Sequence, residues 1–494
     1  MGRYFLGIDV GSSSVKTTVF DAESGTTIGH ATHPQSELSI DSLQPGWAEQ
    51  HPEIWWDCFK VGLADLRSRT DIDLRLIAGI GIAYQMHGLV LVDEDHQLLR
   101  DSIIWCDSRA VETGERAFEA IGHAKCLDTI LNSPGNFTAS KLGWVKAHEP
   151  DTYDRIHKFM LPGDYLAMKL SGEITTTLGG LSEGMFWDFH GRRVSKEVMD
   201  HFGFDSSIIP EVVPSIGEQV SVSDSVAEEL GLSRGTKITY RAGDQPNNAF
   251  SLGVLDPGQV AATAGTSGVI YAVTDQQSRD ERSRINTFLH VNDTPGKERN
   301  GILICVNGAG SMYSWLRRML SVSAADLSFE DMNLLAEQAP VGSEGLLFYP
   351  FGNGAERILE GRLAGADLRN LDFNIHGPSH LIRAGKEGIV FALNLGFDIL
   401  TDMGVPCNTI KAGRANLFLS KSFQEIFANV TQTVLQIYDT DGAEGAARGA
   451  ALGAGYYADT DQAFDSLELI EEIEPTPDLV NRYGEIYESW KQNL

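Results

Sequence analysis

Two glycine- and hydroxyl-rich turns, each between two apolar stretches, carry residue types suited to binding phosphate. The first lies in residues 7–21 and the second in residues 258–273. Backbone N–H groups in such turns can converge on an anion, and glycine lets a phosphate approach closely. Because one turn lies in each half of the chain, the pair predicts a duplicated fold that holds a nucleotide phosphate chain from both sides. The chemistry predicted first is therefore phosphoryl transfer.

The first turn combines the side chains that phosphoryl transfer requires. Asp9 is a candidate carboxylate near a metal ion, Ser12 a donor to phosphate oxygens, and Lys16 a cation that offsets developing charge. The GxxxxGK[ST] pattern of a Walker A loop is absent. By itself the stretch is better explained as an ordinary β-hairpin. The second turn, with Gly265 and Thr266, reverses that preference.

Asp244 is the candidate general base. It lies in the segment 243–248, at the start of the second half, where a carboxylate could accept the proton of a substrate hydroxyl. Aspartate is also common where helices and turns begin, and spacing alone favours that structural role. The catalytic interpretation therefore depends on the rest of the chain.

Two short loops carry candidate residues for binding a polyol. Gln85, Met86 and His87 combine an amide, a flexible apolar side chain and an imidazole within one tight connection. Trp105 follows two isoleucines and could place an indole against a sugar. A histidine satisfied within its turn and a core tryptophan with a surface salt bridge are the structural alternatives.

Gly413 and Asn416 follow a predicted strand and precede a predicted helix, which suits close approach of a nucleoside to the backbone. Alone, this turn is weak evidence. No HExxH motif or Cys/His cluster indicates a permanent transition metal. The GxSxG nucleophile elbow and the GxGxxG dinucleotide fingerprint are also absent.

The elements that must position these residues alternate between strands and helices. Strands are predicted at 4–9, 15–20, 78–84, 88–93, 237–240, 302–306 and 408–411, and helices at 55–67, 141–148, 248–252, 312–320, 421–435 and 442–454. The strands 78–84 and 88–93 are expected to pair around the Gln85–His87 loop. This alternation implies an α/β fold with a partly parallel sheet. A boundary near residue 240 divides the chain into predicted domains 1–243 and 244–494.

The composition of the chain limits the kinds of partner that it is expected to bind. The 494 residues carry a formal net charge of −29, a field that repels nucleic acid and anionic membrane surfaces, so neither is expected as a partner. Five scattered cysteines without a CxxC pair indicate reduced thiols. We find no signal-peptide pattern and no apolar stretch of transmembrane length, and we expect a cytoplasmic protein.

The residues resemble the FGGY carbohydrate kinases of the actin-like ATPase superfamily, and within that family its xylulose-kinase branch. The resemblance runs from Leu6 to about Tyr457 and depends on the order and spacing of its motifs. These motifs lie at residues 7–11, 85–88, 105–109, 137–142, 161–166, 243–244, 265–268 and 445–447.

The resemblance implies two RNase H-like α/β domains with an interdomain cleft, and ATP and Mg²⁺ as cofactors. It implies that Asp244 is the catalytic aspartate and that Asp9 lies near Mg²⁺ and the phosphates. By the same resemblance the phosphate and nucleotide positions are Ser12, Lys16, Gly265, Thr266, Gly310, Gly413 and Asn416. The sugar positions are Met86 and His87, with Gln85, Trp105, Asn136 and Gln245 as further candidates.

One departure from the family pattern concerns the nucleotide. The adenosine turn is usually Gly-Gly-Gly or Gly-Gly-Ala, whereas Ala412-Gly413-Arg414 stands here. Arg414 could stack on the adenine or crowd it, so nucleotide preference stays open.

The activity implied by the resemblance is transfer of the γ-phosphate of ATP to the C5 hydroxyl of D-xylulose. The alternatives are a kinase for another ketose, a polyol or gluconate, and a non-catalytic nucleotide- or sugar-binding protein. Many members of the family are dimers, so a homodimer is among the expectations, although no segment marks an interface.

Overall fold

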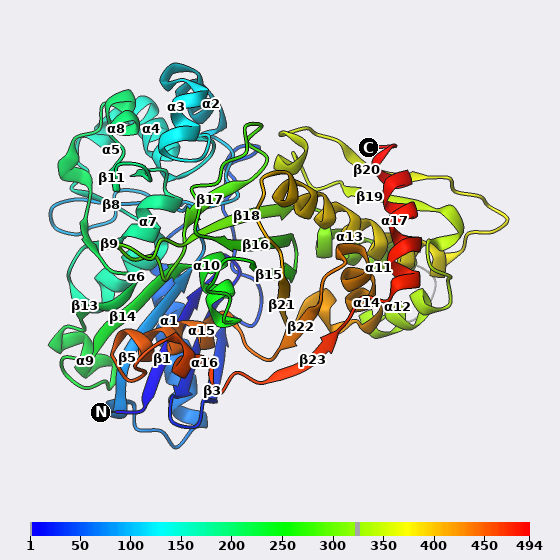
Figure 1. The fold of residues 1–494 in the computed structure, drawn as a ribbon. Coiled ribbons are helices and arrows are strands. Elements are labelled where there is room, and N and C mark those ends of the chain that lie inside the picture. The colour runs from blue at the N-terminus through cyan, green and yellow to red at the C-terminus, as the bar shows by residue number, and fades with distance from the viewer. Residues whose placement is uncertain (1, 322–326) are drawn as a thin grey trace. The chain divides into compact units, whose positions relative to one another are not determined.

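A computed structural model describes residues 2–321 and 327–494, and its strands and helices alternate as predicted (Figure 1). The chain forms two compact units. Unit 1 comprises the residues up to Gly253 with Phe288–Asn300 and Thr440–Leu467, and unit 2 comprises Val254–Thr287, Gly301–Asp439 and Glu468–Leu494. The boundary expected at residue 243 falls inside unit 1. Within the described residues, no helix is long and apolar enough to cross a membrane.

Unit 1 is built around a six-stranded sheet in the order β13-β14-β5-β1-β2-β3. Its strands are β1 (Tyr4–Val10), β2 (Val15–Asp21), β3 (Thr26–His33), β5 (Ile77–Tyr84), β13 (Ile216–Ser221) and β14 (Lys237–Gly243). β1 and β2 form the predicted antiparallel hairpin, whereas β5 runs parallel to both β1 and β14. The carboxyl ends of β1, β5 and β14 therefore meet at one edge of the sheet.

The predicted small-residue helix is α15 (Gly442–Gly453), and it packs against β1, β5 and β14 (Figure 1). A Cβ added to Gly7 of β1 would lie 1.8 Å from the carbonyl oxygen of Ala443, so only glycine permits this approach. The helix α1 (Glu53–Arg69) packs against β2 and β3. The sheet and its helices bury a continuous apolar core.

The predicted pairing of 78–84 with 88–93 is wrong. Both segments contain strands, but β6 (Val90–Val92) pairs antiparallel with β8 (Lys158–Met160) in a separate small sheet. The reason is that β1 and β14 already occupy both edges of β5. The loop after β5 therefore leaves the main sheet instead of turning back along it.

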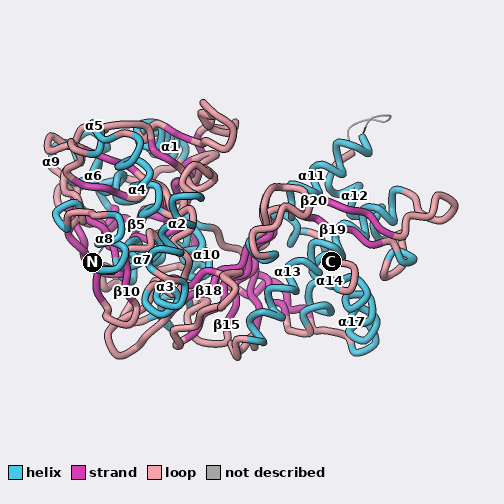
Figure 2. Tube along the Cα trace, turned by 90° about the horizontal axis from the view of Figure 1, so that it is seen from above, coloured by secondary structure: helices cyan, strands magenta, loops and turns pink. Residues whose placement is uncertain are grey.

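A seven-stranded sheet in the order β17-β18-β16-β15-β21-β22-β23 forms most of the framework of unit 2. Its strands are β15 (Gln259–Ala264), β16 (Gly268–Thr274), β17 (Asn286–Leu289), β18 (Asn300–Val306), β21 (Thr409–Gly413), β22 (Leu435–Tyr438) and β23 (Leu469–Ile473). β15 and β16 form the second predicted hairpin. The helix α13 (Pro378–Asp402) packs beside α14 (Lys421–Thr431), which packs beside α17 (Pro477–Lys491) (Figure 2).

The helix predicted over residues 421–435 is shorter than expected. α14 ends at Thr431 because Gln432 adopts a left-handed conformation with φ 55°. The residues after it form β22, which pairs in parallel with β21.

Candidate active site

Three parallel strands of unit 1 bring candidate residues to one edge of the sheet. Asp9 lies near the end of β1, Gln85–His87 follow β5, and Asp244 follows β14. Gly243 and Tyr84 are partners in the β14–β5 register, so Asp244 and the loop after β5 begin side by side. Ligands of α/β sheets bind where the carboxyl ends of parallel strands meet. The structure thus gathers the predicted base and the predicted sugar loop.

Asp9 and Lys16 are cross-strand partners in the β1–β2 hairpin. Burial raises the pKa of Asp9, Lys16 counters this rise, and Asp441 adds to it. A Cβ on Gly442, the first residue of α15, would lie 2.5 Å from Oδ2 of Asp9. The carboxylate therefore lies against the N-terminus of a helix, a position that stabilises negative charge.

Trp105 and Ser12 come from different loops and meet at the first hairpin. The indole Nε1 donates to the hydroxyl of Ser12 over 3.3 Å, and Gln50 Nε2 donates to the carbonyl of Ser12 over 2.7 Å. Trp105 is 48% exposed, so part of the residue is accessible to a ligand. The predicted sugar and phosphate loops thus touch within unit 1, a contact the sequence did not reveal.

Asp244 is the first residue of α10 (Asp244–Ser251), and the N-cap position belongs to Gly243. Burial, with a further contribution from Asp9, raises the pKa of Asp244 to about 7, although hydrogen bonds from Gln245 act in the opposite direction. A carboxyl group with that pKa is partly ionised at neutral pH, the condition that general-base catalysis favours. Asp244 therefore has the electrostatic character that its predicted role requires.

His87 is held from several sides. Its backbone has a φ of 62°, in the left-handed region that non-glycine residues seldom adopt. Its ring packs on Phe137 and Phe288 with centroid separations of 4.6 and 5.4 Å. Nδ1 donates to the carbonyl of Glu183 over 3.0 Å, because a carbonyl oxygen can only accept. These contacts fix the position and orientation of the imidazole ring.

Glu183 was not predicted from the sequence. It ends α7 (Leu178–Glu183), is 2% exposed, and its Oε1 has no hydrogen-bond partner among the described residues. Burial, and then the charge of Asp244, raise the pKa of Glu183 well above its usual range. A Cβ on Gly243 would contact both Glu183 and Met86, so both side chains lie close to the residue that precedes Asp244. The sequence gives no indication of this role, because Glu183 is a single glutamate among small residues and belongs to no helix or strand periodicity.

The remaining sugar candidates differ in accessibility. Met86 and Gln85 are buried, at 4% and 2% exposure, and Gln85 Nε2 lies 3.4 Å from Oε1 of Gln50. Asn136 donates to the carbonyl of Asp107, and its Oδ1 accepts no hydrogen bond from the described residues. Gln245 is partly exposed next to Asp244. The Oδ1 atom of Asn136 is thus buried without a hydrogen-bond partner among the described residues.

The nucleotide candidates of unit 2 also come together. Gly310, in the first turn of α11 (Ala309–Leu320), donates its N–H to the carbonyl of Gly265 over 2.8 Å, and Ser311 donates to the carbonyl of Thr266 over 3.1 Å. The amide nitrogen of Asn416 lies 3.4 Å from the position of a Cβ on Gly265. Gly265 and Asn416, more than 150 positions apart in the sequence, thus lie close together at the second turn.

Gly413 and its neighbour Arg414 lie at the end of β21, which pairs on one side with β15 of the second hairpin. The N–H of Arg414 donates to the carbonyl of Tyr438 over 2.8 Å. Its side chain is exposed and lines a cavity of about 150 Å³ with Phe418 and Lys421. The side chain of Arg414 therefore lies outside the core and is accessible to a ligand.

The described residues contain no group of three or more His, Cys, Asp or Glu side chains that could hold a metal ion. Mg²⁺ in phosphoryl-transfer sites is often held by one or two carboxylates together with substrate phosphate oxygens. Asp9, the cross-strand partner of Lys16 in the first hairpin, is a carboxylate of the kind that such a site uses.

The two sheets, each with a phosphate-type hairpin, define an α/β protein of the actin-like ATPase type. The chain belongs to the FGGY family of carbohydrate kinases: the family model of the N-terminal domain matches residues 4–251 and that of the C-terminal domain matches residues 260–458. The expected resemblance and fold class are thus confirmed. The protein is a sugar phosphotransferase, and its family implies the use of ATP.

Individual relatives agree with this assignment. The chain is 29% identical to "Xylulose kinase" of Bacillus subtilis (strain 168), over 99% of this chain and 96% of the relative. The solved xylulose kinase of Rhodospirillum rubrum is 25% identical with a TM-score of 0.88, covering 99% of this chain and 98% of that one. A gluconate kinase of Lactobacillus acidophilus has a TM-score of 0.89 at 21% identity, covering 99% and 97%, which shows a shared fold alone.

Proposed function

We propose that the protein transfers the γ-phosphate of ATP to the C5 hydroxyl of D-xylulose, giving D-xylulose 5-phosphate and ADP. The observation that carries the proposal is Asp244, a largely enclosed carboxyl with a pKa raised to about 7, beside the Met86-His87 loop. Relatives named xylulose kinase match the chain over nearly its full length, which supports this sugar.

In the proposed reaction Asp244 accepts the proton of the sugar hydroxyl as its oxygen bonds to the γ-phosphorus. The bond between that phosphorus and the β–γ bridging oxygen breaks, and ADP leaves with the bond's electron pair. Lys16 and the N–H groups of the first turn offset the charge on the phosphoryl oxygens. Mg²⁺, held by Asp9 together with the phosphates, would supply further charge neutralisation.

We propose that the imidazole of His87 borders the sugar and that Met86 packs on its carbon face. Trp105, Gln85, Asn136 and Gln245 complete the acceptor site in this proposal. In unit 2 the turn of Gly265 and Thr266 with Gly310, Gly413 and Asn416 holds the nucleotide. We also propose a cytoplasmic enzyme, in keeping with its five free cysteines, and a homodimer by family analogy.

The test is ADP release with Mg-ATP across D-xylulose, L-xylulose, D-ribulose, L-ribulose, L-fuculose, gluconate and glycerol. The expected result is a dominant rate with D-xylulose. A dominant rate with another acceptor, such as gluconate, would keep the phosphotransferase and replace the sugar. No stimulation by any acceptor, with tight ligand binding, would instead support a binding protein.

A further inference from the structure

Lys141 is a fully buried lysine whose ammonium contacts main-chain oxygens instead of carboxylates. It lies on α4 (Thr138–His148) and has 0% exposure. Its Nζ donates to the carbonyl of His87 over 2.8 Å and to the carbonyl of Ile104 over 3.0 Å. No ion pair within 4.0 Å joins Lys141 to a carboxylate in the described parts of the chain. The proposed function assigns this lysine no role.

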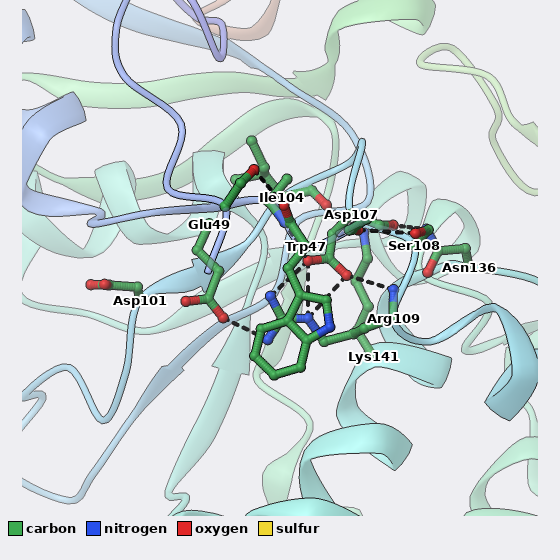
Figure 3. A network of polar contacts seen from close by, with 12 residues as sticks. Trp47, Glu49, Asp101, Ile104, Asp107, Ser108, Arg109, Asn136 and Lys141 are labelled. Atoms are coloured by element: carbon green, nitrogen blue, oxygen red, sulfur yellow. Dashed lines mark hydrogen bonds and ion pairs between the residues drawn. The ribbon is translucent and has the colours of Figure 1, made fainter. Parts of the chain in front are cut away.

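Asp107, the acidic group with the largest electrostatic effect on Lys141, is already engaged. Its two carboxylate oxygens accept from Arg109 over 2.7–3.0 Å, and Oδ2 also accepts from the N–H of Ala48 over 2.6 Å. Figure 3 shows Lys141, Ile104 and the Asp107–Arg109 pair in one network of polar contacts. The acidic partner that would ordinarily balance a buried ammonium is therefore used by a guanidinium.

The two carbonyls that Lys141 binds belong to the two loops proposed to bind the sugar. His87 is itself a sugar candidate, and Ile104 directly precedes Trp105. The strained φ of 62° at His87 persists only where surrounding contacts hold it. Glu183 fixes the imidazole ring through its carbonyl, whereas Lys141 fixes the main chain of the same residue.

We propose that Lys141 is a positioning residue that clamps the His87 loop to the Trp105 loop and thereby sets the geometry of the acceptor site. This inference rests on the proposed function, since it requires those loops to bind the sugar. Lys141 itself touches neither the reacting atoms nor, in this proposal, the sugar.

The cost of Lys141 to the fold supports a functional role over simple packing. Burial lowers the pKa of Lys141 to about 7, and nearby Asp107 only partly offsets this. An apolar side chain of similar volume would avoid that desolvation penalty. What an apolar residue cannot provide is two donors that join two loops.

The experiment compares Lys141→Met with Lys146→Met. Lys146 lies on the same helix and also donates to two main-chain carbonyls, those of Phe202 and Gly203, but away from the sugar loops. Sugar KM, ATP KM, kcat and melting temperature are measured with the acceptor that gives the wild-type enzyme its highest rate. We expect K141M to raise the sugar KM about tenfold or more, with ATP KM nearly unchanged. K146M should leave both KM values near wild type, whatever its melting temperature.

Lys141→Gln keeps the test informative if K141M does not fold. The glutamine amide retains two N–H donors on a shorter side chain. The sugar KM of K141Q should therefore lie between those of wild type and K141M. If K141M does not fold, the sugar KM of K141Q should be higher than that of wild type while its ATP KM is unchanged. A wild-type sugar KM in the folded Lys141 variants, or an equal rise in both KM values, would overturn the inference only. No acceptor-stimulated ADP release from the wild-type enzyme would overturn the proposed function and this inference with it.

Discussion

The N–H of Gly310 donates to the carbonyl of Gly265 over 2.8 Å and so ties the start of α11 to the β15–β16 turn. A Cβ on Gly310 would lie 2.2 Å from that carbonyl oxygen, a separation that backbone atoms do not tolerate. The contact between α11 and the turn proposed to hold the nucleotide therefore requires glycine at position 310, because a side chain there would collide with the turn.

Gly310→Ala should displace the Gly265 turn and weaken nucleotide binding. We expect the dissociation constant of ADP, measured by calorimetry, to rise about tenfold or more, which corresponds to about 1.4 kcal/mol. The matched control is Gly484→Ala in α17, where a Cβ would meet nothing within 4 Å and should leave binding unchanged. Wild-type ADP affinity in G310A would show that this turn does not hold the nucleotide.

Asp244→Asn should remove the base while retaining the shape of the site. We expect kcat to fall about 10²- to 10⁴-fold, the usual contribution of general acid–base catalysis, with substrate dissociation constants close to wild type. The matched control is Asp224→Asn, because Asp224 is likewise the first residue of a helix, α9 (Asp224–Leu230), but is exposed. A sugar-dependent kcat near wild type in D244N would assign the base elsewhere.

The pH dependence of kcat/KM should follow the ionisation of Asp244. Its pKa is about 7, so activity should decline about tenfold per pH unit below that value, where the protonated carboxyl cannot accept a proton. A profile flat from pH 5 to pH 8 would contradict this assignment.

The same raised pKa predicts a stability effect in the opposite direction. A carboxyl whose pKa rises on folding contributes stability at low pH, and this is lost as pH rises towards the folded pKa. D244N, which cannot ionise, should therefore melt at a higher temperature than wild type at pH 8, with a smaller difference at pH 5. Thermal unfolding without nucleotide measures the difference in melting temperature between the two proteins at each pH. A difference that grows as the pH falls would contradict the prediction.

Glu183→Gln tests which carboxyl of the pair carries the proton. Burial and Asp244 both raise the pKa of Glu183, so we expect it to stay protonated while Asp244 ionises. A neutral amide should then leave the midpoint of the pH–rate profile in place. A midpoint shifted to lower pH would mean instead that a charged Glu183 raises the pKa of Asp244.

The sequence predicted well what depends on local pattern. Both hairpins follow from apolar strands around Gly/Ser/Thr turns, and the run of alanine and glycine in 442–454 correctly indicates a helix packed closely on other backbone. The pairing of 78–84 with 88–93 failed because β1 and β14 compete for the edges of β5, and no local pattern records that competition.

The candidate site shows the same limit. Asp9 and Asp244 stand out because each lies at a strand end beside small residues, yet the unusual pKa of Asp244 arises from burial and from Asp9, far away in the chain. Glu183 and Lys141 gain their significance wholly from tertiary contacts. A lysine in an amphipathic helix pattern is ordinarily expected at the surface, and Lys141 is not.

Arg109 provides a final prediction, because it contacts two buried carboxylates, those of Asp107 and Glu49 (Figure 3). Its guanidinium, 1% exposed, binds Asp107 through two nitrogens, approaches Glu49 to 2.6 Å and lies 3.8 Å from the ring centroid of Trp47. Arg109→Met would leave Asp107 buried without its cation, whereas Glu49 would keep its ion pair with Arg100. Leaving one buried charge uncompensated in this way typically costs about 3–5 kcal/mol.

The control is Arg69→Met, which removes an equally well-formed two-nitrogen contact to Asp65 at half-exposed positions. Solvent screens that pair, so its loss should cost about 0–1 kcal/mol. Urea unfolding of both variants gives the comparison. Equal losses would mean that water reaches the Asp107 network, and the loop carrying Trp105 would then lack the rigid base that its proposed role in sugar binding requires.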